Sequence, residues 1–265
     1  MRLITLLLIG VLALVAQQRP ELNDGFAHGD APYLIEEGWT PLLNGKDLSG
    51  WHAERPGTEN QWFTTRGVRW EPFLGPTRLA GIPEPAGTML NGPTGRTANL
   101  VTDGKYGDAE LYVEFLLAKG SNSGVYLMGR YEVQVYDSFG VARDKYPGIE
   151  CGGIYPRWTQ ARGEFEGHSP RVNATRPPGE WQSFDIVFHA PRFDPSGRKA
   201  ANARFVSVKH NGQLIHENIE LTGPTRAAVW EDEKDEKPAG PLMLQGDHGP
   251  VAYRNLQLRP LPAPR

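Results

Sequence analysis

Turns that contain glycine, proline or asparagine interrupt this chain every few residues and limit it to short regular elements. Glycine (31) and proline (23) are both abundant among its 265 residues. Dipeptides such as Asn44-Gly45 and Asn91-Gly92 are typical of turns, because asparagine and glycine tolerate positive φ. Strands and helices do not alternate regularly, which disfavours a doubly wound parallel sheet. We therefore expect an all-β fold, a two-sheet antiparallel sandwich.

Alternating residues between 109 and 137 predict the clearest strands. In the stretch 109–117 apolar side chains occupy every second position, as in a strand with one buried face. The stretches 125–128 and 131–137 follow after short turns, so we expect three strands in an antiparallel meander. Further strands are predicted at 183–189, 204–210, 213–217, 242–245 and 251–258, with an Asn-Gly hairpin turn at Asn211-Gly212.

The first residues predict export. Met1-Arg2 supplies a positive start, and residues 3–16 form an apolar run without charge. This run is shorter than the roughly 20 residues that a transmembrane helix needs. We therefore expect a signal peptide at 1–16, and a periplasmic or secreted protein without a membrane span after cleavage; an uncleaved N-terminal anchor is the alternative. Residues 17–37 are predicted to form a linker or N-terminal arm, and residues 38–262 a single domain.

Charge and motifs exclude several classes of function. Basic and acidic residues nearly balance (28 against 31) and form no basic stripe, which argues against a nucleic-acid partner. The chain contains no phosphate-binding glycine motif, no G-x-S-x-G and no H-E-x-x-H. Its one cysteine, Cys151, allows neither an internal disulfide nor a zinc-thiolate cluster, and we expect a packed, inert thiol.

The stretch 131–137 contains the first group of candidate site residues. Period-two geometry places Glu132, Gln134 and Tyr136 on one face of the predicted strand. Carboxylate and amide groups on an open sheet face can hydrogen-bond the hydroxyl groups of a sugar. An ordinary solvated outer face explains the same pattern equally well, so the pattern alone leaves both interpretations open.

A second group lies near the C-terminus. Gln245, Asp247, His248 and Arg254 are spaced so that they could converge where two strands meet. His248 can move protons because it titrates near neutral pH, and Arg254 can stabilise a developing oxyanion. The alternative interpretation is that Asp247-His248-Gly249 is a plain loop and Arg254 the partner in a structural ion pair.

Motifs along most of the chain resemble the 3-keto-disaccharide hydrolase domain family. The segment 40–51 is very similar to the opening signature of that family. The similarity continues in the expected order through 121–127, 131–138, 153–155, 178–181, 240–245 and 253–255, and ends near residue 262. Differences are Cys151-Gly152-Gly153, where a run of small residues is usual, and a proline- and glycine-rich insert at 71–87. The resemblance implies a concanavalin A-like jelly roll that is often preceded by a signal peptide.

The resemblance also implies activity on disaccharides or other glycosides oxidised at C3. A ketone at C3 acidifies the hydrogen on C2, so a base can form an enolate that expels the C1 aglycone by β-elimination. Water then adds to the double bond and completes net hydrolysis. In this scheme Glu132 or His248 is the base, and Arg254 stabilises the enolate oxygen.

Substrate binding is assigned by the same resemblance to polar side chains of the motifs: Asn122, Gln134, Asp137, Tyr155 and Gln245. A divalent cation could replace Arg254 as the electrophile, and no other cofactor is implied. Two other functions remain open. One is a lectin-like carbohydrate-binding module, because this fold hosts both classes. The other is an ordinary glycosidase with two carboxylates, either Glu110 and Glu114 or Glu132 with a partner.

Overall fold

The computed structural model describes residues 31–142, 150–225 and 236–262. The predicted signal peptide (1–16) and most of the predicted arm (17–37) lie outside these residues. Within the described ranges, no helix combines the length and the apolar character needed to cross a bilayer.

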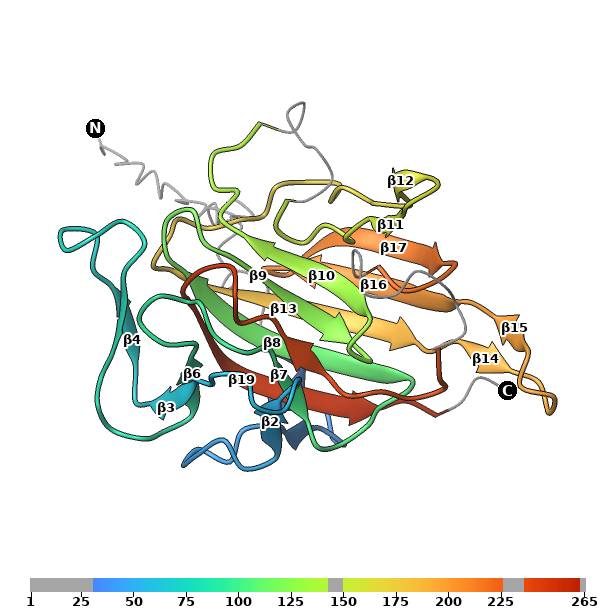
Figure 1. The fold of residues 1–265 in the computed structure, drawn as a ribbon, viewed down its shortest axis with the longest axis horizontal. Helices are drawn as coiled ribbons and strands as arrows, with labels where there is room; N and C mark the ends of the chain where they lie inside the picture. Colours follow the sequence, from blue (N-terminus) through green and yellow to red (C-terminus); the bar gives the residue numbers. More distant parts are fainter. Residues whose placement is uncertain (1–30, 143–149, 226–235, 263–265) are drawn as a thin grey trace, which may run out of the picture.

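Two antiparallel sheets contain most of the regular structure (Figure 1). The eight-stranded sheet has the order β17 (Gln213–Leu221), β16 (Ala203–His210), β13 (Trp181–His189), β8 (Ala109–Leu117), β19 (Val251–Pro260), β6 (Thr88–Leu90) and β3 (Phe63–Thr65), and β1 (Thr40–Pro41) pairs with β19. The five-stranded sheet has the order β10 (Tyr131–Tyr136), β9 (Asn122–Leu127), β18 (Met243–Leu244), β7 (Leu100–Thr102) and β2 (Trp51–Ala53).

Smaller elements lie around these sheets. Three hairpins are formed by β4 (Val68–Trp70) with β5 (Leu79–Gly81), β11 (Arg157–Thr159) with β12 (Gly163–Phe165), and β14 (Arg192–Phe193) with β15 (Lys199–Ala201). The short helix α1 (Pro32–Ile35) follows the N-terminal segment, and Tyr33 contacts Tyr112 on the outer face of the larger sheet, with ring centroids 5.1 Å apart.

The core lies between the two sheets, because the strands direct their apolar positions inward. Val113 and Phe115 of β8 belong to the same buried cluster as Val133 and Val135 of β10, and all four are fully buried. Each large apolar side chain contributes about 1.5–3 kcal/mol when it is buried, so this cluster holds the sheets face to face. The prediction of an antiparallel two-sheet jelly-roll sandwich of concanavalin A type is confirmed.

The predicted meander is wrong in one respect. β9 and β10 form an antiparallel hairpin as expected, but β8 pairs with β13 and β19 in the other sheet. The chain crosses between the sheets at residues 118–121, where Gly120 adopts a positive φ of 68°. Both β8 and β9 present an apolar face to the core, and alternation alone cannot distinguish strands that pair from strands that meet across a core.

Two other local predictions are confirmed. The turn between β16 and β17 has φ 50° at Asn211 and 78° at Gly212, as a type I′ hairpin requires. Cys151 is buried, and burial raises the pKa of its thiol to about 12. The thiol therefore stays protonated and unreactive.

Candidate active site

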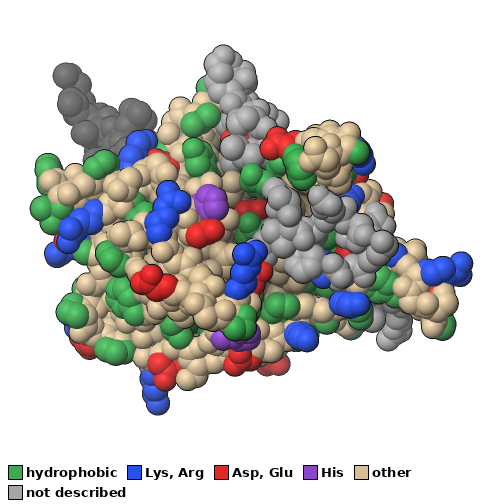
Figure 2. Space-filling model, in the orientation of Figure 1, with side chains coloured by type: hydrophobic (Ala, Val, Ile, Leu, Met, Phe, Trp, Pro, Cys, Tyr) green, Lys and Arg blue, Asp and Glu red, His purple; other side chains and the backbone are tan. Residues whose placement is uncertain are grey.

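A hollow of about 320 Å³ lies on the outer face of the five-stranded sheet. β10 contributes Glu132 and Gln134, because Tyr131, Val133 and Val135 point inward and the residues between them point outward. Histidine and acidic side chains are seen next to one another over this sheet in Figure 2. The lining residues come from several elements: Arg55, Asn99, Asn122, Tyr126, Glu132, Gln134, Tyr155, Gln245, Asp247 and His248.

Gly124 of β9 lies at the centre of this group. In the β9–β10 register Gln134 is opposite Gly124, and the amide N–H of Gln245 donates to the Gly124 carbonyl at 3.0 Å. Asn122 precedes Gly124 by two residues and therefore points to the same face. Directly opposed residues have Cβ atoms about 4.5–5.5 Å apart. The three amide side chains consequently lie around Gly124, which is itself buried.

The edge of β10 that does not pair with β9 forms hydrogen bonds with two other segments, and these bonds hold the strand in place. The Gly152 N–H donates to the Gln134 carbonyl at 2.7 Å, and the Gln134 N–H donates to the Gly153 carbonyl at 2.9 Å. The Glu132 N–H donates to the Thr225 hydroxyl oxygen at 2.8 Å. These bonds satisfy backbone groups that an edge strand otherwise exposes, so Glu132 and Gln134 are held at defined positions.

Three amide oxygens of the hollow have no hydrogen-bond donor among the described residues. The buried side-chain oxygens of Asn122, Gln134 and Gln245 accept no hydrogen bond from the described residues. A buried polar atom without a partner costs about 1–3 kcal/mol, so its presence in a folded protein needs an explanation. A ligand rich in hydroxyl groups would supply the missing donors.

The hydrogen bond between His248 and Asp247 favours the protonated form of the imidazole. Its Nδ1 lies 2.5 Å from Oδ1 of Asp247. This hydrogen bond is the main cause that raises the pKa of His248 above its usual value near 6.5, against the opposite effects of partial burial and of Arg96. The imidazole therefore stays protonated to a higher pH and can act as a general acid.

Glu132 and Tyr155 form the opposite part of the hollow. Glu132 is 3% exposed. Burial, followed by the negative charges of Glu132 and Glu164, raises the pKa of Tyr155. The Tyr155 hydroxyl therefore remains a neutral donor close to the carboxylate.

Arg254 does not belong to this site. Its neighbour Tyr253 is fully buried in the core, so Arg254 points to the outer face of the larger sheet. There its Nε donates to Glu114 at 2.6 Å, and its guanidinium lies 4.1 Å from the ring centroid of Trp181. The prediction that Arg254 shares a site with His248 is wrong, because the core of the sandwich separates the two side chains. Arg254 is the partner in a structural ion pair.

Asp137 is also outside the hollow. One oxygen of its carboxylate accepts a hydrogen bond from the Gly120 N–H at 2.8 Å and lies 3.2 Å from Lys119 Nζ. The side chain therefore holds the crossing between β8 and β9. Asp137 does not line the hollow, so its role in substrate binding stays a prediction from the sequence.

Tyr136 does not line the hollow either. The other predicted residues all line it: Asn122, Glu132, Gln134, Tyr155, Gln245, Asp247 and His248. The family model of the 3-keto-alpha-glucoside-1,2-lyase-like domain matches residues 38–259, which is most of the chain. The chain belongs to the 3-keto-disaccharide hydrolase family. Membership indicates a glycosidase-type enzyme that acts on sugars.

Solved structures share the fold of this family member. A crystal structure from Parabacteroides distasonis ATCC 8503, described as a "putative glycosyl hydrolase", shares 25% identity with the chain over 85% of it and 84% of that protein, with a TM-score of 0.57. A second structure with the same description and organism shares 20% identity over 84% and 99% of the two chains, with a TM-score of 0.53. A search of curated proteins found no match.

Three residues that line the hollow of this family member were not expected from the sequence. Tyr126 shares the outer face of β9 with Asn122, so period-two alternation identifies it in retrospect. Asn99 precedes β7 and Arg55 follows β2. The pairing of β7 and β2 with distant strands is not encoded in local alternation, so no local signal identifies these two.

The carboxylate pair Glu110 and Glu114 is not available for an ordinary glycosidase mechanism in this family member. Both lie on the outer face of β8, where Glu110 pairs with Arg259 and Glu114 with Arg254. Neither lines the hollow of the five-stranded sheet.

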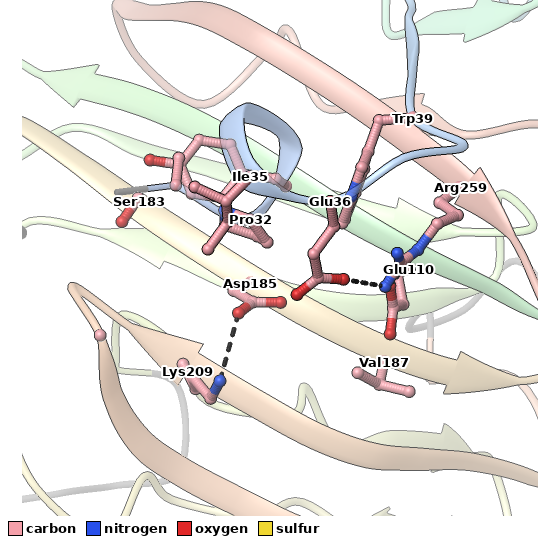
Figure 3. Close-up of a pocket in the computed structure, with 13 residues that line it drawn as sticks. Pro32, Ile35, Glu36, Trp39, Glu110, Ser183, Asp185, Val187, Lys209 and Arg259 are labelled. Atoms are coloured by element: carbon pink, nitrogen blue, oxygen red, sulfur yellow. Dashed lines mark hydrogen bonds and ion pairs between the residues drawn. The ribbon is translucent and has the colours of Figure 1, made fainter. Parts of the chain in front are cut away.

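A second hollow, of about 330 Å³, lies on the outer face of the larger sheet beside α1 (Figure 3). Its charged side chains pair with one another. Glu36 lies 2.6 Å from Arg259, and Asp185 lies 3.4 Å from Lys209. Of the residues predicted for a site, Glu110 lines it, and Glu110 is paired with Arg259. The hollow that contains Glu132 and His248 is therefore the candidate active site.

Proposed function

We propose that this enzyme cleaves glycosides of 3-keto sugars by elimination followed by hydration. The observation that supports the proposal is the content of one hollow: a buried carboxylate, Glu132, an Asp247–His248 pair, and three amide oxygens to which no residue in the described part of the chain donates. Base, acid and hydroxyl acceptors are the groups that this reaction needs, and family membership favours a 3-keto glycoside as substrate.

Glu132 removes the proton from C2 in the first step. The electrons of the C2–H bond move toward C3, and the C3 oxygen becomes an enolate oxygen. The neutral Tyr155 hydroxyl and the amide N–H groups of the hollow can donate to that oxygen. The guanidinium of Arg55, which also lines the hollow, adds a favourable electrostatic field for the enolate oxygen.

The glycosidic bond breaks in the second step. The C3 carbonyl re-forms, a C1–C2 double bond is created, and the aglycone oxygen takes a proton from His248. Water then adds at C1 and returns a proton to His248, while C2 regains its proton from Glu132. The sum is one glycoside and one water giving the free aglycone and the 3-keto sugar, and both side chains return to their initial states.

Substrate orientation is the role of the three amides. Oxygens of Asn122, Gln134 and Gln245 accept hydrogen bonds from the hydroxyl groups of the sugar, which satisfies the buried acceptors. We place this activity in the periplasm or outside the cell, as the apolar run 3–16 predicts.

Comparing a 3-keto glucoside with its unoxidised parent tests the proposal. We expect aglycone release from the ketone alone, and a loss of about 100- to 10,000-fold in Glu132→Gln, because a general base contributes that much. Release from both compounds would instead support a two-carboxylate glycosidase, and binding without release a lectin-like module. Loss of activity in a chelator, restored by a divalent metal, would assign the electrophilic role to a cation.

A further inference from the structure

We infer that Gly124 is a positioning residue whose missing side chain provides the space for the Glu132 carboxylate. The inference rests on the proposed function, because it assumes that Glu132 is the base. Gly124 lies inside β9 and is not among the residues with positive φ. Its backbone conformation is thus open to any residue. A glycine inside a strand weakens it, so another reason for glycine is required here.

That reason is the space above its Cα. A Cβ at position 124 would lie 3.0 Å from Cδ of Glu132, and Oε1 of Glu132 is closer still. It would also lie 2.7 Å from Cε2 of Tyr126. The carboxylate therefore occupies the volume that any other side chain at position 124 would fill. We call this volume the Gly124 pocket.

The backbone of Glu132 cannot move to relieve such a clash. Its N–H is bonded to the Thr225 hydroxyl at 2.8 Å, and its carbonyl accepts from the Tyr155 N–H at 3.3 Å. With both backbone groups held, an added methyl group must displace the side chain. The carboxylate would then rise out of the Gly124 pocket and leave the position from which it reaches the substrate.

A displacement of the Glu132 carboxylate by the added methyl group should lower the rate of proton removal by a measurable amount. Misplacing a catalytic group by about 1 Å can cost on the order of 100-fold in rate. The Gly124 pocket is formed by the backbone of one strand and a side chain of the next, and the three amides stand around it. Substrate binding by the amides and proton removal by Glu132 therefore depend on different atoms, so the rate at saturation should fall more than the affinity.

Gly124→Ala is the first test. We expect kcat for a 3-keto glucoside to fall by about 100-fold with a small change in KM. Gly87→Ala is the matched control, because Gly87 also lacks positive φ and an added Cβ there meets nothing within 4 Å. In the double variant Gly124→Ala/Glu132→Asp the acidic side chain is shorter by one methylene, which removes the clash between the carboxylate and the added methyl group. If the two substitutions acted independently, their fold-losses in kcat would multiply. We expect kcat of the double variant to be at least tenfold higher than that product predicts.

The outcomes separate the two claims. If Glu132→Gln is inactive while Gly124→Ala matches Gly87→Ala, the Gly124 pocket has no role and the proposed function stands. If Glu132→Gln is fully active, the proposed function itself fails. Should Gly124→Ala not fold, Gly124→Ala/Glu132→Ala removes the clash with the carboxylate, and Gly124→Ala/Tyr126→Leu removes the clash with the Tyr126 ring. Recovery of the folded state in the Glu132 pair supports the inference, and recovery in the Tyr126 pair alone contradicts it.

Discussion

At the scale of single residues, the side of a strand decides the role of a polar side chain. Glu132 and Arg254 both lie on strands of the sandwich and both fall within the residues that match the family model. Glu132 points to the hollow, whereas Arg254 points away from it and pairs with Glu114. The two polar side chains thus lie on opposite sides of the sandwich, and we propose a role in chemistry for Glu132 and a role in stability for Arg254.

Arg254→Ala should lower stability without lowering the rate. The change removes the ion pair with Glu114 and the contact with Trp181, at a cost of about 1–2 kcal/mol. We expect a lower midpoint in urea unfolding and a kcat within about twofold of the wild type at a temperature where both are folded. A large fall in kcat in a folded Arg254→Ala protein would show that Arg254 takes part in the reaction.

Asp247→Asn should shift the pH dependence of cleavage. Asp247 raises the pKa of His248, and His248 must be protonated to act as the acid, so activity falls as pH rises through that pKa. Removing the charge of Asp247 lowers the pKa, and the alkaline limb of kcat should move to lower pH. An unchanged alkaline limb would mean that His248 is not the acid.

At the scale of elements, β10 is an edge strand that other segments complete. Residues 152–155 and Thr225 bind its backbone, and they come from parts of the chain far from β9 in sequence. The position of Glu132 therefore depends on segments outside its own hairpin.

Thr225→Val tests this dependence. The variant keeps the shape of the side chain but removes the acceptor of the Glu132 N–H, which should cost about 1–2 kcal/mol and lower kcat on the order of tenfold. Thr225→Ser retains the hydroxyl and is the matched control. Equal kcat in the two variants would show that this bond does not position Glu132.

Local alternation identified the outer face of β10 correctly, including Glu132 and Gln134, because period two is a property of the strand itself. It also identified the strands at 109–117 and 251–258. It did not identify the sheet to which each strand belongs. For that reason β8 was paired with β9, and Arg254 was placed beside His248. Arg55 and Asn99 depend on the same long-range pairing, which only the three-dimensional structure reveals.

At the scale of the whole molecule, the sandwich buries histidines that the proposed reaction does not use. His210 and His216 are 0% and 3% exposed. Burial lowers the pKa of His210 to about 3 and that of His216 to about 4. Both therefore stay neutral in the folded protein under conditions where an unfolded chain would protonate them.

The free energy of unfolding should consequently decrease as pH falls from about 6.5 toward 4.5. In this window the unfolded state binds protons that the folded state does not, and each imidazole contributes up to about 1.4 kcal/mol per pH unit. His216→Gln, which keeps a donor for the Gly152 carbonyl, should show a shallower slope in urea unfolding across these pH values. An identical slope in this variant would contradict the assignment of His216 as a neutral buried group.

The most direct test of the elimination mechanism follows the hydrogen on C2. A 3-keto glucoside labelled with deuterium at C2 is incubated with the enzyme in ordinary water, and the sugar product is examined by NMR and mass spectrometry. Proton removal by Glu132 predicts that the aglycone is released more slowly from the labelled sugar than from the unlabelled one, that label passes to water to the extent that the acid on Glu132 exchanges before C2 is reprotonated, and that Glu132→Gln stops the release. Release of the aglycone at the same rate from both sugars, with all of the deuterium still on C2, would contradict the mechanism.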